Sequence, residues 1–567
     1  MTKAHLFRVA VCLLLLNLLV LNFLGQEQES RNTALTALPQ YTDVTESAQI
    51  RFNHNPSATQ QKYILETIGA GGAFFDYDND GLLDIYLVNG ARLPDLQKSE
   101  AGFSNQLYRN NGNGTFTDMT TKAGVAGRGY GGGVAAGDYD NDGHEDLYVT
   151  TYQGNILYRN NGDGTFVDVT NQARVADGKW STSAAFLDYN NDGKLDLFVT
   201  HYVNFTFENN VICKDWEGRP YYCHPDVYDG LPNTLYRNNG DGTFTDVSKA
   251  AGIQNPQGKG LGVVAADYDG DGHIDIFVAN DAVANFLYHN RGDGTFEDVT
   301  LISGTGFDRN GRSQSCMGTD FGDYDRDGKL DLIVTNLEFE THTLYRNKGD
   351  GTFEDSTQET GLAQATFYYA GWGTKFIDFD NDGFQDLFIA NGGLLDNIEL
   401  HKKGVTYAQS KLLLRNLNGK FVNETKRYGT DLLKPTVARG AAFGDYDNDG
   451  DIDVLVLNNS EPPNLFRNDG GNLNHWLQIK LVGTKSNRNA IGARVTVTAG
   501  DLRLADQVKG GGSYLSANDY RLHFGLGRRT QIDSLEIRWP SGNEERLKNI
   551  KVNQLMILRE RRENAHP

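Results

Sequence analysis

The sequence predicts an all-β protein, a seven-bladed β-propeller followed by a small β-sandwich-like domain. Three observations predict this fold class. An acidic loop, Asp-x-Asp/Asn-x-Asp-Gly-x-x-Asp, occurs seven times, a hairpin motif alternates with it, and apolar residues alternate in the C-terminal segment. The composition agrees, because 65 Gly, 27 Tyr and 29 Phe favour many short strands joined by tight turns.

The acidic loops organise the first part of the chain. Each follows a segment of small residues and precedes an apolar run, as at 132–136 and 147–149 around the second loop. Strand, loop and strand is therefore the natural interpretation. The seven loops begin at Asp76, Asp138, Asp188, Asp267, Asp323, Asp378 and Asp445.

The hairpin motif is clearest at 157–166, which reads Leu-Tyr-Arg-Asn-Asn-Gly-Asp-Gly-Thr-Phe. Asn-Gly and Asp-Gly between apolar runs are strong hairpin signals, because these residues tolerate a positive φ. Each unit of the repeat thus holds two hairpins. Four strands are the content of one propeller blade.

The acidic loop occurs in all seven units, but the hairpin motif is incomplete in the last one. Seven elements with an aromatic residue or Leu before Arg/His-Asn accompany the loops, at Tyr108, Tyr158, Tyr236, Tyr288, Tyr345, Leu414 and Phe466. Only six continue into a Phe-x-Asp-Val-Thr-like strand, whereas similar residues stand at 41–45, before the first loop. We expect the strand at 41–45 to complete the last blade and close the ring without an open edge.

The loops carry the oxygen ligands that calcium prefers. Calcium takes six to eight oxygens, and carboxylates at positions 1, 3, 5 and 9 can converge with the carbonyl of position 7 around the Gly at position 6. We expect up to seven calcium ions as cofactors. The predicted ligands are Asp76, Asp78, Asp80, Leu82, Asp84, Asp138, Asp140, Asp142, His144, Asp146, Asp188, Asn190, Asp192, Lys194, Asp196, Asp267, Asp269, Asp271, His273, Asp275, Asp323, Asp325, Asp327, Lys329, Asp331, Asp378, Asp380, Asp382, Phe384, Asp386, Asp445, Asp447, Asp449, Asp451 and Asp453.

Two other interpretations of these loops were weighed. An EF-hand needs Glu at position 12, where this chain has Leu87, Val149, Val199, Val278, Val334, Ile389 and Val456. Turn chemistry alone could explain one loop, but seven loops place like charges a few Å apart, with repulsion of roughly 1 kcal/mol per pair. We therefore expect calcium, in a structural and not a catalytic role.

Known repeats have the same appearance. The acidic loops between Gly/Ala-rich and Leu/Val-rich strands resemble the FG-GAP/VCBS repeats of integrin-like propellers. The segment from His475 to about Leu558 resembles the ASPIC/UnbV domain, at Ile491-Gly492-Ala493-Arg494-Val495, Gly510-Gly511-Gly512-Ser513-Tyr514-Leu515-Ser516, His523-Phe524-Gly525-Leu526-Gly527 and Ile537-Arg538-Trp539-Pro540-Ser541-Gly542. Together these resemble the cartilage acidic protein family, which implies a secreted or surface-bound calcium-binding propeller.

The C-terminal segment also predicts a sheet on its own residues. Apolar residues alternate at Leu477, Ile479 and Leu481 and again at Leu535 and Ile537, as in half-buried strands. The glycines at 510–512 favour a bulge or tight bend over a close approach to another backbone.

The N-terminus predicts an export signal. A basic start with Lys3, His5 and Arg8 precedes an apolar run at 9–24, about 24 Å long as a helix and short of the roughly 30 Å hydrocarbon core. An uncleaved membrane anchor is the alternative. We expect a signal or anchor at 1–25, a linker at 26–40, the propeller at 41–472 and the ASPIC/UnbV-like domain at 473–560.

The cysteines fit an exported protein that is secreted, periplasmic or on the cell surface. Cys213 and Cys223 bracket a short segment in an insertion, and we expect a disulfide between them. Metal ligation with the adjacent His224 is the rival interpretation. Cys316 has no such neighbour, and we expect it to be a buried apolar residue.

A ligand site is predicted at the propeller mouth, where a polar pair follows the second strand of each blade. Trp180, His201, Tyr202 and Asp281 fall close to it, and we hypothesise a protein or glycan ligand there. Turn chemistry at the strand ends is the competing explanation.

We expect an adhesion or binding module and not an enzyme, because the sequence shows no Ser-His-Asp set, phosphate loop or zinc pattern. The alternative is a carbohydrate-active or other extracytoplasmic enzyme with its site near the third blade. The formal net charge of −21 argues against a nucleic-acid partner.

Overall fold

The computed structural model describes residues 38–98 and 101–561, so the expected signal or anchor and most of the linker lie outside the described residues. The prediction of an all-β protein is confirmed, since the helices are single short turns between strands. All elements below belong to the unit Gln40–Pro567. Within the described ranges, no helix combines the length and the apolar character needed to cross a membrane.

In the described part of residues 40–469, seven antiparallel sheets, here called repeats 1 to 7, each contain four strands, and a fifth strand from the C-terminal segment joins the sheet of repeat 4. The acidic loop of each repeat joins its first strand to its second. In chain order the repeats are β2 (Gly72–Phe75), β3 (Asp84–Leu87), β4 (Gln106–Asn110) and β5 (Phe116–Asp118); β6 (Tyr130–Gly137), β7 (Asp146–Tyr152), β8 (Ile156–Asn160) and β9 (Phe166–Asp168); β10 (Ser181–Leu187), β11 (Asp196–His201), β14 (Thr234–Asn238) and β15 (Phe244–Asp246); β16 (Gly260–Ala266), β17 (Asp275–Asn280), β18 (Phe286–Asn290) and β19 (Phe296–Asp298); β20 (Thr319–Gly322), β21 (Asp331–Val334), β22 (Thr343–Asn347) and β23 (Phe353–Asp355); β24 (Gly371–Ile377), β25 (Asp386–Asn391), β26 (Leu412–Asn416) and β27 (Phe421–Asn423); and β28 (Ala438–Gly444), β29 (Asp453–Asn458), β30 (Asn464–Asp469) and β1 (Gln40–Asp43).

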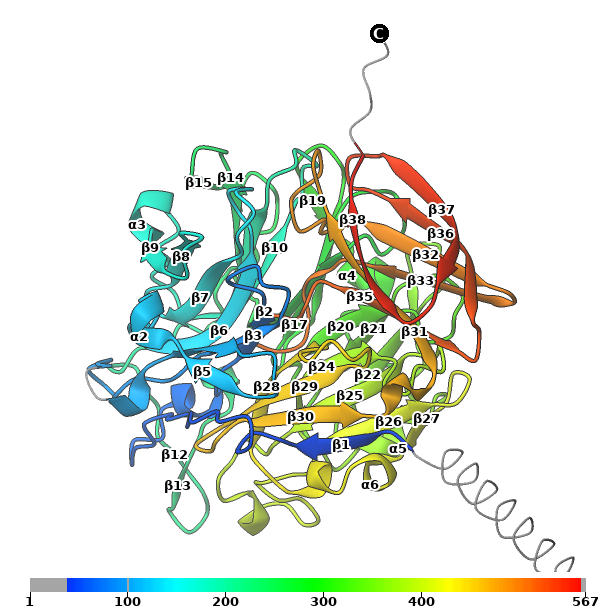
Figure 1. The fold of residues 1–567 in the computed structure, drawn as a ribbon. Helices are drawn as coiled ribbons and strands as arrows, with labels where there is room; N and C mark the ends of the chain where they lie inside the picture. The colour runs from blue at the N-terminus through cyan, green and yellow to red at the C-terminus, as the bar shows by residue number, and fades with distance from the viewer. Residues whose placement is uncertain (1–37, 99–100, 562–567) are drawn as a thin grey trace, which may run out of the picture. The chain divides into compact units, whose positions relative to one another are not determined.

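The N-terminal strand joins the last repeat. β1 runs antiparallel to β30, with Tyr41 opposite Asn468 and Asp43 opposite Phe466, and Figure 1 shows the blue strand beside the yellow-orange one. This is the strand that the sequence predicts at 41–45. It takes the place that the Phe-x-Asp strand holds in the other six repeats.

The first strands of the repeats lie side by side. β2 neighbours β6, and the series continues through β10, β16, β20 and β24 to β28, which in turn lies against β2. These strands are rich in Gly and Ala and are buried along their whole length, as in β6 and β28. Small side chains let neighbouring strands approach closely; a Cβ on Gly373, for example, would meet Ala441 at 2.6 Å.

The C-terminal strands, orange to red in Figure 1, form two further sheets that we call the C-terminal lobe (residues 473–561). The sheet orders are β35-β31-β38 and β33-β32-β36-β37, and apolar residues of both sheets share one buried core. A sandwich-like lobe agrees with the alternation in the sequence. Its strands are β31 (His475–Val482), β32 (Arg494–Ala499), β33 (Leu502–Gln507), β34 (Gly510–Gly511), β35 (Leu522–Gly527), β36 (Gln531–Arg538), β37 (Glu544–Lys551) and β38 (Gln554–Arg559).

One segment of the lobe, residues 510–520, runs along the first strands of the repeats. β34 pairs with β16, Leu515 O accepts from Val134 N at 3.0 Å, and Ala517 N donates to Gly72 O at 3.0 Å. A Cβ on Gly510 would lie 2.1 Å from Phe186 O. The preference for a simple bend at 510–512 was therefore wrong, because these glycines also allow close backbone approach.

Short helices lie in the connections between strands. They are α2 (Thr120–Ala123), α3 (Thr170–Ala173), α4 (Thr300–Ser303), α5 (Leu362–Thr366) and α6 (Thr425–Tyr428), with 3-10 turns η1 (Ile64–Thr67), η2 (Ala101–Phe103), η3 (Pro225–Val227), η4 (Ile398–Leu400), η5 (Asp431–Leu433) and η6 (Gly471–Leu473). A two-stranded hairpin, β12 (Cys213–Lys214) and β13 (Pro220–Tyr221), stands in the insertion of repeat 3.

Candidate metal centres in the acidic loops

The Gly at position 6 shapes every acidic loop. Gly81 has φ 88°, and the other six glycines at this position are also left-handed. The N–H of this glycine donates to the carboxylate of position 1, at 3.1 Å from Gly81 to Asp76 and 2.7 Å from Gly383 to Asp378. The same bond recurs in all seven loops, so the turn holds the first carboxylate inside the loop.

The Asp at position 9 is anchored by the backbone. Asp84 opens β3, is 0% exposed, and accepts hydrogen bonds from Tyr77 N at 3.1 Å and Asn110 N at 2.7 Å. The corresponding pair of bonds occurs in every repeat. The Asp at position 9 lies on the second strand and is held by the third strand of its repeat, independently of any ion.

Other carboxylate oxygens in the loops lack a hydrogen bond. Asp76 Oδ1, Asp78 Oδ1 and Asp323 Oδ1 are enclosed and have no hydrogen-bond partner in the described part of the chain. One oxygen each of Asp76, Asp78 and Asp84 lies within 4.8 Å of the others. Converging oxygens without donors are what a hard cation such as calcium requires, so these residues fit the predicted ion.

Similar groups form at Asp138, Asp140 and Asp146 and at Asp323, Asp325 and Asp331. At position 7 the structure places the backbone N–H against the carboxylate of position 5, as from Leu82 to Asp80 at 3.0 Å. This bond also recurs in all seven loops, at the remaining predicted residues His144, Lys194, His273, Lys329, Phe384 and Asp451.

The electrostatics of the loops disfavour bare charge. Burial, helped by the neighbouring carboxylates of each loop, raises the pKa of Asp84 to about 8 and of Asp138 and Asp323 to about 7. Folding therefore brings together carboxylates that resist ionisation unless a cation neutralises them.

Arginines partly offset this charge in some loops. Arg109 Nε lies 2.7 Å from Asp78, and its Nη2 lies 3.1 Å from Asp80. Arg346 and Arg415 contact positions 3 and 5 of the loops in repeats 5 and 6 in the same way. This role was not predicted from the sequence, although Arg precedes Asn in six of the seven third strands.

Asparagines link each repeat to its neighbour, and the sequence analysis missed them too. Asn160 Nδ2 donates to Tyr77 O of the preceding repeat at 2.8 Å, and equivalent bonds join the other repeats. Asn110 of repeat 1 donates to Tyr446 O of repeat 7 at 2.8 Å. The Asn that recurs at or next to the end of every third strand is the sequence signal that could have revealed these links.

Loop asparagines make a second set of such links. Asn79 Nδ2 donates to Gly143 O of the next repeat at 2.9 Å, and Asn448 Nδ2 of repeat 7 donates to Gly81 O of repeat 1 at 3.0 Å. These two bonds connect the acidic loops of repeats 1 and 2 and of repeats 7 and 1.

The C-terminal lobe reaches every acidic loop. Gln478 Nε2 donates to Asp445 Oδ2 at 2.8 Å, Lys480 Nζ lies 3.5 Å from Asp76 Oδ2, and Asn489 Oδ1 accepts from Asp138 N at 2.8 Å. The remaining loops are met by Asn487 at Asp188, Gln507 at Asp267, Arg494 at Gly328 and His523 at Asn381.

The residues predicted for a ligand site at the mouth are all buried. Trp180, His201, Tyr202 and Asp281 are 3%, 0%, 2% and 8% exposed. Tyr202 Oη donates to Asp281 Oδ2 at 2.5 Å, and the rings of Trp180 and Tyr202 meet edge to face at 5.1 Å. Their contacts are with one another and with other buried side chains, and a ligand role for them stays a prediction.

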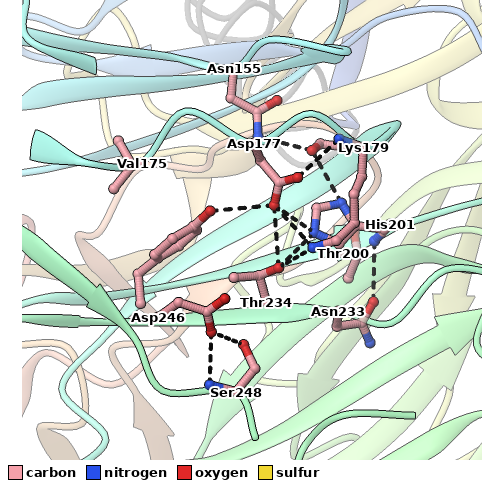
Figure 2. Close-up of polar contacts among 12 residues, drawn as sticks. Asn155, Val175, Asp177, Lys179, Thr200, His201, Asn233, Thr234, Asp246 and Ser248 are labelled. Atoms are coloured by element: carbon pink, nitrogen blue, oxygen red, sulfur yellow. Dashed lines mark hydrogen bonds and ion pairs between the residues drawn. The ribbon is translucent and has the colours of Figure 1, made fainter. Parts of the chain in front are cut away.

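Figure 2 shows the polar network that encloses His201. Asp177 Oδ2 lies 3.1 Å from His201 Nε2 and accepts from Lys179 Nζ and from Thr234 Oγ1, each at 3.2 Å. Burial opposes ionisation of Asp177, but His201 and Lys179 hold its pKa well below the ordinary value. This carboxylate is satisfied by the protein alone.

The structure also places Ser181 Oγ 3.2 Å from His201 Nδ1, so a serine, a histidine and an aspartate do meet. Ser181 is 1% exposed, and its Oγ accepts from Asn155 Nδ2 at 2.9 Å. With every member enclosed, the arrangement is a packed polar network.

The predicted disulfide is confirmed between Cys213 and Cys223, which excludes metal ligation with His224. Cys316 is buried, as expected. The disulfide braces the β12–β13 hairpin, whose turn carries Trp216 with 85% of its surface exposed. Asp215 fixes this turn by accepting from the N–H groups of Glu217 and Arg219, each at 2.9 Å.

Comparison with known proteins finds cartilage acidic protein 1 of Homo sapiens, Mus musculus and Xenopus tropicalis, each 29% identical. The matches extend over 314 to 316 residues, which are 52% or 53% of this chain and 43% or 44% of the relatives. The matched part is thus less than half the length of these relatives.

Two solved structures are similar in part. One is an Agrocybe aegerita lectin that recognises non-reducing terminal N-acetylglucosamine, with TM-score 0.36 and 16% identity over 65% of this chain and 87% of that one. The other is a Bacillus licheniformis rhamnogalacturonan lyase, with TM-score 0.37 and 13% identity over 75% of each chain.

Family models match both parts of the chain. The FG-GAP-like repeat model matches residues 76–149, 138–199, 224–278, 267–334 and 323–389, which together cover about half of the chain. The ASPIC and UnbV model matches residues 483–565. The chain therefore belongs to the family of proteins with FG-GAP-like repeats, and it carries an ASPIC and UnbV segment at its C-terminal end.

Proposed function

We propose that the chain is an exported seven-bladed β-propeller whose acidic loops bind up to seven calcium ions, and that it serves as a binding module for a protein or glycan. The observation that carries the proposal is the repeated group of enclosed carboxylate oxygens without hydrogen-bond donors, as at Asp76, Asp78 and Asp323. Calcium would supply the missing positive charge and complete the coordination of these oxygens.

Contacts between the first and last repeats support a closed ring. β28 lies against β2, and β1 pairs with β30. Asn110 links repeats 1 and 7 in the same way as its equivalents link the other repeats, and Asn448 adds a second bond between repeats 7 and 1. A ring of seven such sheets leaves no first or last repeat with an open side.

The role proposed for calcium is structural. Asp at position 9 already joins two strands of its repeat, and the side chains of the C-terminal lobe contact the same loops. An ion in a loop would therefore hold together the repeat, its neighbour and the lobe. At about ten times its dissociation constant, calcium would stabilise the fold by roughly 1.4 kcal/mol per site.

The proposed partner surface lies outside the loops, because the lobe contacts each of them. Trp216 is the side chain that we propose to meet the partner, since it is exposed on a braced hairpin and loses little freedom on binding. The disulfide supports export to an oxidising compartment. We favour binding over catalysis, because the network of Ser181, His201 and Asp177 is enclosed.

The metal content tests the first part of the proposal. In equilibrium dialysis against about 1 mM calcium, the full chain should hold close to seven equivalents above the free concentration, by elemental analysis. Asp76→Asn should remove about one equivalent, whereas Lys122→Ala, at an exposed position of α2, should remove none. A chain that retains no calcium under these conditions would refute the proposed role.

A glycan array tests the second part. Binding of the wild type that is lost in Trp216→Ala and kept in Lys122→Ala supports the hairpin as the contact. Equal binding by Trp216→Ala and the wild type would exclude it.

A further inference from the structure

The fourth repeat differs from the other six in the residue that its third strand places beside the loop. The residue before the Asn that ends the third strand is Arg109, Arg159, Arg237, Arg346, Arg415 or Arg467 in those repeats, and it is His289 in repeat 4. Where arginine contacts the loop, it can only donate hydrogen bonds, because guanidinium has no free electron pair. A neutral imidazole offers such a pair to a metal.

His289 lies against two predicted ligands of the loop. Its Nδ1 is 3.2 Å from Asp275 Oδ1 and 3.4 Å from Asp269 Oδ2, and all three atoms lie within 4.8 Å of one another. The Nδ1 atom is enclosed, and its polar contacts in the described part of the chain are ion-pair contacts with these two carboxylates, without a well-aligned hydrogen bond. Asp275 is 0% exposed, so the group opens toward solvent only past the imidazole and Asp269.

These distances match a coordination sphere. Ligands at about 2.1 Å from a tetrahedral zinc ion lie roughly 3.4 Å apart. Two of the three spacings in this group are already close to that value. In repeat 5, the equivalent place is filled by Arg346, whose Nε lies 2.5 Å from Asp325.

We propose that the loop of repeat 4 binds a borderline divalent metal of the zinc class through His289 Nδ1, Asp269 and Asp275, whereas the other loops take calcium. Imidazole nitrogen favours zinc and its neighbours in the first transition row, while sites made only of carboxylate and carbonyl oxygens favour calcium. This inference rests on the proposal that the acidic loops bind cations. It assigns a different ion to one of them and adds a ligand that lies outside the loop.

A different role for His289 must be distinguished from this one. A protonated imidazole could simply replace the positive charge of arginine, in which case arginine itself would serve equally well. His289→Arg gives repeat 4 the residue that the six sister repeats carry. Arg346→His moves the imidazole to the equivalent place in repeat 5, next to Asp325 and Asp331.

Cobalt(II) titration in about 1 mM calcium is the test, because cobalt occupies zinc-type sites and its visible absorption reports a nitrogen ligand. The full-length wild type should take one equivalent. His289→Arg should bind cobalt at least about 100-fold more weakly, since loss of an outer-sphere partner alone costs 10–100-fold. Arg346→His should gain a second equivalent, while the calcium content of the remaining loops stays unchanged.

Two results would overturn the proposal. One is cobalt binding that is equal in the wild type and His289→Arg, and the other is no cobalt uptake by a wild type that is loaded with calcium. Absence of both ions from the wild type would instead refute the proposed function. If His289→Arg does not fold, the second equivalent in Arg346→His decides.

Discussion

The protein contains two kinds of buried carboxylate. Asp177 is surrounded by donors and cations, with Lys179, Thr234 and Tyr236 donating to one of its oxygens. Asp138, at position 1 of the second acidic loop, has Asp140 and Asp142 as neighbours instead. Their pKa values accordingly move in opposite directions, well below the ordinary value for Asp177 and up to about 7 for Asp138.

This difference distinguishes a buried carboxylate with a structural role from one that can bind an ion. A buried carboxylate whose partners are all protein groups is complete without a ligand, whereas one surrounded by like charge is not. Polar character and a place after the second strand of a blade marked His201 and Asp281 as candidates in the sequence, yet their surroundings are of the first kind. The acidic loops are of the second kind.

The largest effect expected from this comparison is a pH dependence of stability that calcium abolishes. Without divalent ions, Asp84, Asp138 and Asp323 keep protons up to about pH 8, 7 and 7 in the folded state but lose them near 3.8 when unfolded. The folded state then binds more protons across this window, so the free energy of unfolding falls as pH rises, by on the order of several kcal/mol. Urea unfolding in a chelator, from pH about 4.5 to about 8, measures this.

Saturating calcium is the control for that experiment. The bound ion keeps the loop carboxylates ionised, and the fall in stability with pH should disappear. Asp177 acts in the opposite sense, because its depressed pKa contributes stability that is lost only as pH falls below about 4. Stability in chelator that rises between pH 5 and 8 would contradict the account of the loops.

Removal of the Asp177 carboxylate should give the next largest effect. Asp177→Ala leaves Lys179 and His201 without their partner in a buried site, and we expect a loss of about 3–5 kcal/mol in the free energy of unfolding. The loss should be the same with calcium and with chelator, by urea unfolding. If calcium abolished this loss of stability, Asp177 would belong with the carboxylates of the acidic loops, and its assignment to the other kind would be wrong.

A smaller effect, with a change of sign, is expected in the second loop. Asp140→Asn gives this loop the residue that the third loop carries naturally as Asn190. In calcium, the variant should lose up to roughly 1.4 kcal/mol of stability through weaker binding. In chelator, it should be as stable as the wild type or slightly more stable, because Asp142 loses a like-charged neighbour.

Thermal unfolding in both conditions measures that change. The reverse replacement, Asn190→Asp in the third loop, is the matched control and should stabilise the calcium form. Equal destabilisation of Asp140→Asn in both conditions would mean that the carboxylate acts only within the protein.

Local pattern explains how much could be predicted from the sequence. Short motifs predicted the loops, the hairpins and the Cys213–Cys223 disulfide. The count of repeated motifs predicted the strand at 41–45. The alternation of Leu477, Ile479 and Leu481 predicted the sheet of the C-terminal lobe for the same reason.

Contacts between distant segments could not be predicted in this way. The path of 510–520 along the first strands depends on partners as remote as Gly72 and Val134, and no local pattern encodes them. The position of His201 depends on Asp177 from another connection, 24 residues away in the chain but in direct contact. The asparagine links, by contrast, were visible as repeated residues whose partner was unknown.

Thermal unfolding of the full chain with calcium and with a chelator tests the central claim most directly. Seven sites at roughly 1.4 kcal/mol each would contribute on the order of 10 kcal/mol, so removal of calcium should lower the midpoint by tens of degrees or leave no cooperative transition. Restored calcium should restore the midpoint. An unchanged midpoint in chelator, for a chain shown to have lost its metal, would contradict the claim that calcium holds the fold together.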